Sequence, residues 1–432
     1  MLNLNEIYTE VDSLDSDKIM DLMRTVIRID TTVPPGNSYR EYVDVISPYF
    51  KDLGYSLEEV IMPEELVKKI PYPLEGPRVN LVATKDFGQE KFATFYGHMD
   101  VVPAPDEGDK KWRFPPFEAT MIKSGKIYGR GVSDMKGAMV CLIFALQIIE
   151  KLNLTPRYNI RVLNCTDEEI GDYPGVRYLE EHGYLKGTEL EEKSIIFCME
   201  GVINPIIPIG MAGDVDIDVE TIGRSCHSGM NFLGVNALEE MVPILVELIK
   251  LKKIVEERES KDIPGFPRFK TGEKRNMAPM FNLDIIRSGE KSNIVPDLCT
   301  LTINRRIIPE EKFENVEQEI LEAIQRGKAK SKAIDVRTTF KYSYPPWKTD
   351  PNSPASMRFK KVISTVQNIP EEKIQLIGAS GSTDMGFLTE YDVIIHGVGN
   401  PGSNEHGVNE TIKLKDVKTY IKELIVFLCV DL

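Results

Sequence analysis

The sequence predicts an α/β protein in which a mostly parallel sheet, covered by helices on both faces, is interrupted by a smaller α+β domain. Up to about residue 212, short apolar or β-branched runs alternate with amphipathic helical patterns, as in chains that build parallel sheets. Beyond that point the expected order becomes βαββαβ, the ferredoxin-like pattern. The alternation of strands and helices resumes from Pro345. We therefore expect 1–212 and 343–432 to form the larger domain and 213–342 the inserted one.

The larger domain is expected to begin with two helices. Ser16 as a cap and Asp17 in the first turn predict a helix over 17–29. Gly54 is expected to end a second helix over 39–53. The other elements expected in this part are strands at 79–84, 92–96, 158–165 and 194–199 and helices at 136–151 and 175–183.

The inserted domain is expected to open with a strand over 214–222, because polar and apolar residues alternate there as in a half-exposed strand. The stretch 261–278 is rich in Pro, Gly, Lys and Arg, which predicts a surface loop. The other elements expected in this domain are helices at 237–257 and 310–326 and strands at 281–286, 298–305 and 334–342. Strands at 373–377 and 393–397 and a helix at 414–429 are expected to complete the larger domain.

The composition excludes several classes of partner. Among the 432 residues, 53 Lys and Arg face 67 Asp and Glu, a net charge of −14, which argues against binding to nucleic acid or to anionic membranes. The apolar runs are far shorter than the roughly 20 residues of a bilayer span, and the N-terminus lacks the pattern of a signal peptide. The 6 cysteines form no Cys-x-x-Cys pair. We therefore expect reduced thiols in a cytoplasmic protein.

Acidic and imidazole side chains follow the ends of the expected strands. His98 and Asp100 follow one strand, the pair Glu168 and Glu169 follows another, and Glu200 follows a third. Because ligands in open α/β sheets bind beyond the carboxyl ends of the strands, these residues are expected to converge in one crevice. A mixed imidazole and carboxylate set suits Zn²⁺, Mn²⁺ or Co²⁺ better than Mg²⁺ or Ca²⁺.

The same residues also allow finer expectations. Asp100 lies two residues after His98 and could accept its ring N–H, which would fix the tautomer. Of Glu168 and Glu169, one could bind metal while the other transfers protons. Taken singly, each motif has a plainer interpretation: the glutamate pair as a helix start, and Glu200 with its glycine as a turn.

Several motifs, in order over about residues 17–427, resemble those of the M20 family of co-catalytic zinc aminoacylases and peptidases. Five of them resemble the metal-binding motifs, and the others resemble the lid and substrate-recognition elements of that family. The metal-binding motifs are Tyr96–Pro103, Tyr128–Gly137, Thr166–Gly171, Glu200–Gly201 and Gly402–Glu410, and the others are Gly223–Gly229, Gly234–Ala237, Ser292–Asp297 and Arg306–Pro309.

The resemblance implies a dinuclear site. Asp134 would bridge two divalent metal ions, most simply Zn²⁺, for which Co²⁺ or Mn²⁺ can substitute. His98 and Glu200 would complete one metal site, and Glu169 and His406 the other. The family also implies a cis peptide bond after the bridging aspartate. In two-metal hydrolases the ions lie about 3.5–4 Å apart.

The resemblance further implies roles in catalysis and binding. Glu168 would be general base to the attacking water and then general acid to the leaving amine, and Asp100 would orient His98. His227 would reach the active site of a neighbouring subunit and stabilise the oxyanion, which implies a homodimer through the inserted domain. Asn293 and Arg306 would hold the substrate's carboxylate or polarise its carbonyl. The substrate loop at 381–384 would add Ser382 and Thr383.

These features indicate an enzyme that removes an N-acyl group, acetyl or succinyl, from an amino acid. Within the family, Glu200 in place of Asp is typical of deacylases and carboxypeptidase-like members. Met385 and Gly386 follow Asp384, where some deacylases of succinylated diamino acids carry an Arg, which argues against a dicarboxylic substrate. A dipeptidase or carboxypeptidase with the same dinuclear zinc site is the alternative.

Two further classes fit the sequence less well. A non-catalytic, metal-stabilised binding protein would not need Glu168, which is present. A serine or cysteine hydrolase is disfavoured because no Gly-x-Ser-x-Gly elbow in a fitting context occurs.

Overall fold

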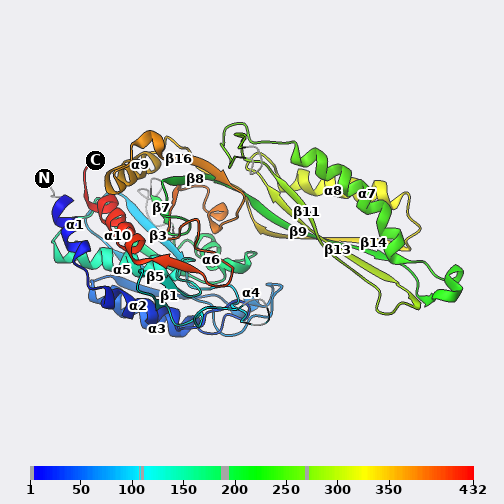
Figure 1. Ribbon diagram of the computed structural model, residues 1–432, viewed down its shortest axis with the longest axis horizontal. Helices are drawn as coiled ribbons and strands as arrows, with labels where there is room; N and C mark the ends of the chain where they lie inside the picture. Colours follow the sequence, from blue (N-terminus) through cyan, green and yellow to red (C-terminus); the bar gives the residue numbers. More distant parts are fainter. Residues whose placement is uncertain (1–3, 107, 109–110, 186–193, 268–271) are drawn as a thin grey trace. The chain divides into compact units, whose positions relative to one another are not determined.

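The computed structural model describes residues 4–106, 108, 111–185, 194–267 and 272–432, which form two compact units (Figure 1). The first unit comprises Met1–Pro208, Thr349–Leu376 and Phe387–Leu432, and the second comprises Ile209–Lys348 and Ile377–Gly386. The architecture confirms the predicted α/β class with a smaller α+β part.

The first unit is built on a mixed sheet whose strands lie in the order β1-β2-β6-β3-β7-β17. Strands β6, β3, β7 and β17 are parallel, whereas β2 runs antiparallel to β6 and to β1. The carboxyl ends of the four parallel strands therefore share one edge. The strands are β1 (Ser56–Ile61), β2 (Val79–Lys85), β3 (Phe92–His98), β6 (Asn159–Cys165), β7 (Ile195–Cys198) and β17 (Asp392–Ile395).

Helices cover this sheet and supply most of the core. In α5, every residue from Lys136 to Leu146 is buried, and its predicted bounds agree with the structure. Phe197 of β7 stacks on Phe95 with ring centroids 5.3 Å apart and meets Phe359 edge-on at 5.1 Å, which joins the sheet to α9. The helices are α1 (Leu4–Asp12), α2 (Ser16–Ile27), α3 (Tyr39–Asp52), α4 (Glu64–Val67), α5 (Lys136–Lys151), α6 (Gly175–Glu181), α9 (Pro354–Gln367) and α10 (Leu414–Cys429).

The cap predicted for α2 is wrong by one residue. The N-cap is Asp15, whose carboxylate accepts a hydrogen bond from the backbone amide of Asp17 at 2.9 Å, and Ser16 is already helical. Aspartate and serine both favour the N-cap of a helix, so the sequence alone does not decide whether Asp15 or Ser16 is the cap.

The second unit holds the predicted βαββαβ order. Its antiparallel sheet has the strand order β11-β13-β9-β14, with α7 and α8 packed against each other. Asn236 caps α7 by accepting from the amides of Leu238 and Glu239 at 3.1 and 3.3 Å. The elements are β9 (Gly213–Ile222), α7 (Ala237–Glu256), β11 (Met280–Ser288), β13 (Leu298–Ile307), α8 (Phe313–Lys328) and β14 (Asp335–Tyr344).

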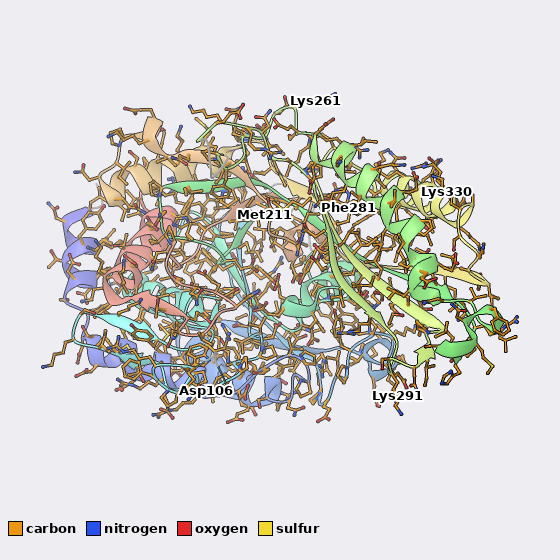
Figure 2. The ribbon with its side chains drawn as sticks, turned by 45° about the vertical axis from the view of Figure 1, so that its right-hand side comes forward. Asp106, Met211, Lys261, Phe281, Lys291 and Lys330 are labelled. Carbon is orange, nitrogen blue, oxygen red and sulfur yellow. The ribbon has the colours of Figure 1, made fainter. Side chains whose placement is uncertain are left out.

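The alternation along β9 places two kinds of residue on its two faces. Val215, Ile217 and Val219 are buried in a core that α7 and α8 complete. Phe281 of β11, labelled in Figure 2, belongs to the same core. Where the helices pass, a Cβ on Gly327 would lie 2.4 Å from the Cα of Ile244, so only glycine allows this approach.

Short strands complete the structure. β8 (Ile206–Met211) and β16 (Gln375–Ala379) lie where the chain passes between the units, and β15 (Trp347–Lys348) pairs with β8. β4 (Thr120–Met121), β5 (Lys126–Tyr128) and β18 (Thr411–Lys413) form a small sheet of the first unit. Within the part of the chain that the structure describes, no helix has the length and apolar character needed to cross a membrane.

Candidate metal centre

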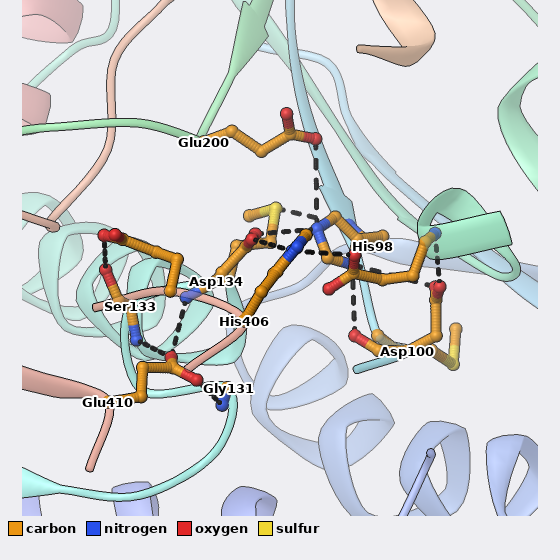
Figure 3. A network of polar contacts seen from close by, with 12 residues as sticks. His98, Asp100, Gly131, Ser133, Asp134, Glu200, His406 and Glu410 are labelled. Atoms are coloured by element: carbon orange, nitrogen blue, oxygen red, sulfur yellow. Dashed lines mark hydrogen bonds and ion pairs between the residues drawn. The ribbon is translucent and has the colours of Figure 1, made fainter. Parts of the chain in front are cut away.

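Three parallel strands deliver acidic and imidazole side chains to one place (Figure 3). His98 is the last residue of β3, Glu168 and Glu169 lie in the short helix η1 (Glu168–Ile170) after β6, and Glu200 follows β7. Ligand atoms of His98, Glu168 and Glu200 all lie within 4.8 Å of one another, and so do those of His98, Asp134 and Glu169. The shared edge of the parallel strands brings His98 and the three glutamates together, and the loop before α5 (Lys136–Lys151) adds Asp134.

Asp134 lies at the centre of this cluster and faces two ways. Its Oδ1 lies 3.1 Å from His98 Nε2, and its Oδ2 lies 3.3 Å from His406 Nε2. His406 Nε2 lies 3.0 Å from Glu169 Oε2, and His98 Nε2 lies 3.9 Å from Glu200 Oε1. The donors therefore form two groups that share one carboxylate, which is how a carboxylate bridges two ions.

The donor atoms fit divalent ions in chemistry and spacing. Zinc binds histidine nitrogen and carboxylate oxygen at about 2.0–2.2 Å, which places tetrahedral ligands about 3.4 Å from one another. The separations of 3.0–3.9 Å between the donors agree with that spacing. The mixed imidazole and carboxylate set is the one that Zn²⁺, Co²⁺ and Mn²⁺ prefer.

The electrostatics of the cluster also favour a cation. Hydrogen bonds to Asp134 and Glu169 raise the pKa of His406 to about 10. Burial disfavours the charged form of His98, yet its bond to Asp134 and the surrounding carboxylates raise its pKa well above the usual value. Burial and the charge of Asp134 raise the pKa of Glu169. The carboxylates therefore create a strongly negative potential at this point, which bound metal ions would neutralise.

Asp100 has a different contact from the one that the sequence suggests. The ring Nδ1 of His98 lies 3.1 Å from the main-chain oxygen of Asp100 but 3.7 Å from its carboxylate Oδ1. The carboxylate Oδ2 instead accepts from the backbone amide of Glu169 at 2.8 Å. Asp100 thus orients His98 through its carbonyl group and holds the η1 turn through its side chain.

Glu410 is a site residue to which the sequence analysis gave no role. Its Oε1 accepts from the amides of Ser133 and Asp134 at 2.8 and 3.2 Å, and its Oε2 accepts from the amide of Gly131 at 3.0 Å. Arg130 Nη1 donates to Oε2 at 2.7 Å. Burial raises the pKa of Glu410 to about 7, which Arg130 opposes. This buried carboxylate orders the loop that carries Asp134, and the peptide bond between Asp134 and Met135 is cis.

Two of the expected substrate-site residues meet in the second unit. Arg306 Nη1 donates to Ser382 Oγ at 2.7 Å, and its Nε donates to Asn304 Oδ1 at 3.0 Å. The neighbouring Arg305 is fully buried and ion-paired with Glu311 at 2.6 Å. Of the two arginines, Arg306 is therefore the one whose guanidinium remains partly exposed.

The remaining expected residues of this set also lie in the second unit. His227 is exposed at the end of β10 (Cys226–His227), and its Nδ1 accepts from the amide of Gly229 at 3.0 Å. The carbonyl of Asn293, just before β12 (Ile294–Val295), accepts from the amide of Ser228 at 3.0 Å. Thr383 is buried beside Ser382. His227 pairs with Ile294, so Asn293 lies next to the strand residue that faces His227.

Comparison with known proteins gives one family match and many relatives. The family model described as Peptidase family M20/M25/M40 matches residues 94–428. A probable succinyl-diaminopimelate desuccinylase of Staphylococcus epidermidis is 28% identical over 422 residues, which cover 94% of this chain and 96% of that protein. A metallohydrolase of Methanocaldococcus jannaschii is 27% identical over 418 residues, covering 93% and 96%.

Solved structures share the fold. A dipeptidase, Dug1p, from Saccharomyces cerevisiae aligns with a TM-score of 0.76 and 18% identity over 98% of both chains. An M20 family metallo-carboxypeptidase from Sulfolobus solfataricus aligns with a TM-score of 0.73 and 20% identity over 96% of this chain and 98% of that one. Human carnosine dipeptidase 1 aligns with a TM-score of 0.71 and 19% identity over 98% of both chains.

Proposed function

The chain belongs to peptidase family M20/M25/M40, and from that premise we propose that it is a dinuclear, metal-dependent amidohydrolase that removes an acetyl or succinyl group from the nitrogen of an amino acid. The observation that carries the proposal is the carboxylate of Asp134, whose two oxygens lie against His98 and His406 separately. A carboxylate placed between two imidazoles suits a pair of divalent ions that share one ligand.

Five residues would hold the ions. His98 and Glu200 would bind one ion, His406 and Glu169 would bind the other, and Asp134 would bind both. We propose Zn²⁺ as the metal, for which Co²⁺ or Mn²⁺ could substitute. When bound, the ions supply Lewis acidity that polarises a carbonyl group and acidifies water.

The proton transfers fall to Glu168. This glutamate is only 7% exposed and offers a carboxylate oxygen within 4.8 Å of ligand atoms of His98 and Glu200. It would take the proton from the attacking water and then give it to the nitrogen of the leaving amine. Asp100 supports this role, because its carboxylate holds the backbone amide of the next residue, Glu169.

The second unit would bind the substrate. Arg306, fixed by Asn304 and Ser382, presents a partly exposed guanidinium suited to bidentate binding of a carboxylate. Asn293 and Thr383 would assist in this, and His227 would stabilise the oxyanion. In this proposal 213–342 is the lid and dimerisation domain, and 1–212 with 343–432 is the catalytic domain.

An apolar surface supports a homodimer through the inserted domain. Leu238, Val242, Val246 and Ile249 of α7 are 41–51% exposed and recur every three or four residues, so they form one stripe. The neighbouring β11 is an edge strand of its sheet, with Ile285 and Ile286 exposed. Such a surface is typical of an interface between subunits.

The choice of substrate rests on a named relative and on Glu200. The desuccinylase-named relative and Glu200 support an N-acyl amino acid as substrate. A dipeptidase or carboxypeptidase acting on short peptides is the alternative, in line with the names of the structural neighbours. A cytoplasmic location stays a prediction from the cysteine pattern.

One assay separates these functions. Amine release is measured from N-acetyl, N-succinyl and N-formyl amino acids and from free dipeptides, with and without added Zn²⁺ or Co²⁺. Metal-dependent cleavage of acylated substrates alone supports the deacylase. Cleavage of dipeptides alone would establish the alternative, and no metal-dependent cleavage of any substrate would overturn the proposal.

A further inference from the structure

The turn that carries Glu168 and Glu169 starts in an unusual conformation. Asp167 has a φ of 63°, in the left-handed region that a residue other than glycine seldom adopts. Its side chain is fully buried. A buried carboxylate is costly unless charged or polar groups contact it, so the partners of Asp167 decide whether this turn can form.

Both oxygens of Asp167 have partners from distant parts of the chain. The hydroxyl of Tyr39, on α3, donates to Oδ1 at 2.8 Å, and Arg78 Nε donates to Oδ2 at 3.1 Å. Tyr39 and Arg78 are themselves fully buried. With one donor on each oxygen, the plane of the carboxylate is fixed, and with it the backbone that leads to Glu168.

Arg78 joins this turn to two further loops. Its Nη2 donates to the carbonyl of Pro35 at 2.7 Å, and its Nη1 donates to the carbonyls of Gly76, at 3.0 Å, and Glu75. The guanidinium also lies over the ring of Tyr39, 5.5 Å from its centroid. Lysine could not reproduce this, because it lacks the planar fork of donors.

The ends of the same turn are held separately. Asn80 Oδ1 accepts from the amide of Thr166 at 3.0 Å, and Asp100 Oδ2 accepts from the amide of Glu169 at 2.8 Å. Asp167 therefore lies between two anchored points, and its own contacts determine the path of the backbone between them.

We propose that Tyr39 and Arg78 are positioning residues that act through Asp167 to set the places of Glu168 and Glu169. The inference rests on the proposed function, in which Glu168 transfers protons and Glu169 binds metal. Both positioning residues precede residue 94, where the family match begins. A displacement of about 1 Å in a reacting group can reduce a rate about a hundredfold, so loss of one donor need not unfold the protein to impair it.

The test compares Tyr39→Phe with Tyr42→Phe. Both tyrosines are fully buried on α3, but the Tyr42 hydroxyl forms no hydrogen bond with the residues that the structure describes. Tyr39→Phe is expected to lower kcat by about ten- to a hundredfold with little change in KM. It should also weaken Co²⁺ binding to the metal-free protein, followed by visible absorption. Tyr42→Phe should change neither quantity.

Two more variants guard against a purely structural effect. Asp167→Asn keeps the shape of the side chain, and Arg78→Lys keeps the charge but lacks the planar guanidinium, so both should lower kcat and Co²⁺ affinity as Tyr39→Phe does. Each variant is assayed well below its own melting temperature, so that loss of folded protein does not contribute to the result. Equal kcat and Co²⁺ affinity in the Tyr39→Phe and Tyr42→Phe variants would overturn the inference. If the wild type cleaves no amide, the proposed function fails, whereas the Co²⁺ titration still tests the positioning.

Discussion

Ser133 and Glu405 lie 272 residues apart in the chain, yet the hydroxyl of Ser133 donates to Glu405 Oε1 at 2.7 Å. Each is the immediate neighbour of a proposed metal ligand, Asp134 or His406. This hydrogen bond therefore joins the two loops that carry those ligands. The metal centre therefore depends on distant parts of the chain meeting in the folded state.

Glu168→Gln is expected to reduce turnover by at least about 10²- to 10⁴-fold, because the amide cannot take a proton from water. The metal content should stay that of the wild type, since Glu168 is not assigned as a ligand. Turnover and metal content are measured on the same preparation. Glu372→Gln, at an exposed position of the first unit, is the control. Loss of metal from the Glu168 variant would show that this glutamate is a ligand instead.

Removal of metal is expected to abolish activity. Dialysis against a chelator should leave inactive protein, and Zn²⁺, Co²⁺ or Mn²⁺ should restore turnover, with two ions bound per chain by elemental analysis. Asp134→Asn should bind both ions more weakly, because one residue contributes to both sites. Activity that survives complete chelation would contradict the metal mechanism.

Glu410→Gln is expected to destabilise the protein by about 1–3 kcal/mol, because an amide NH2 in place of one carboxylate oxygen leaves the buried backbone amide of Gly131 or of Ser133 without its acceptor. The loop that carries Asp134 should also loosen, so metal affinity should fall. Urea unfolding and Co²⁺ titration measure the two effects. The matched control is Glu118→Gln, which breaks the exposed pair with Arg28 and should cost about 0–1 kcal/mol. Similar losses in both variants would rule out the special role of Glu410.

Val246→Glu is expected to convert the proposed dimer to monomers, because it places a charge in the middle of the exposed stripe of α7. Light scattering after size-exclusion chromatography gives the mass of each form. Met357→Glu, at a 43% exposed site on α9 of the first unit, should leave the mass unchanged. A wild type that is monomeric at all concentrations would refute the dimer.

The stability of the second unit is expected to depend on the charge of Glu247. Hydrogen bonds from Lys250 and Lys330 lower the pKa of Glu247 to about 2. A carboxyl group with a lowered pKa stabilises the folded state above its unfolded pKa and loses that effect as the pH falls toward the folded value. Glu247→Gln should therefore lower the melting temperature at pH 7, and its difference from the wild type should shrink between about pH 5 and 2. A difference independent of pH would exclude the ionic effect.

The fold could be predicted where local pattern and tertiary structure agree. The bounds of α5 and α10 agree with the sequence analysis because each segment contains an apolar stretch within a pattern of helical length. The sequences of β1 and α9 contain no comparable apolar stretch, and neither element was predicted. In β1 only Val60 is buried. The antiparallel placement of β2 depends on pairing with β6, which no local pattern encodes.

The residues of the candidate site also differ in how far the sequence alone could indicate them. His98, Glu168, Glu169 and Glu200 follow strand ends, so their convergence follows from the topology of a parallel sheet. Asp134 and His406 lie on loops, and only the resemblance to a family indicated them. Tyr39 and Arg78 carry no local signal, because their role comes from a contact with Asp167 across 128 and 89 residues.

The pairing of β7 with β17 has a consequence for synthesis on the ribosome. Ile195 pairs with Asp392, so the strand that completes the sheet emerges long after its partner. At about 5–20 residues per second, the interval is roughly 10–40 s. During that time the second unit can fold, because most of it is contiguous in the chain. The edge of β7 that later pairs with β17 stays unpaired over the same interval. Nascent chains that stop before β17 would expose that edge, and an unpaired strand edge can pair with another chain and promote aggregation.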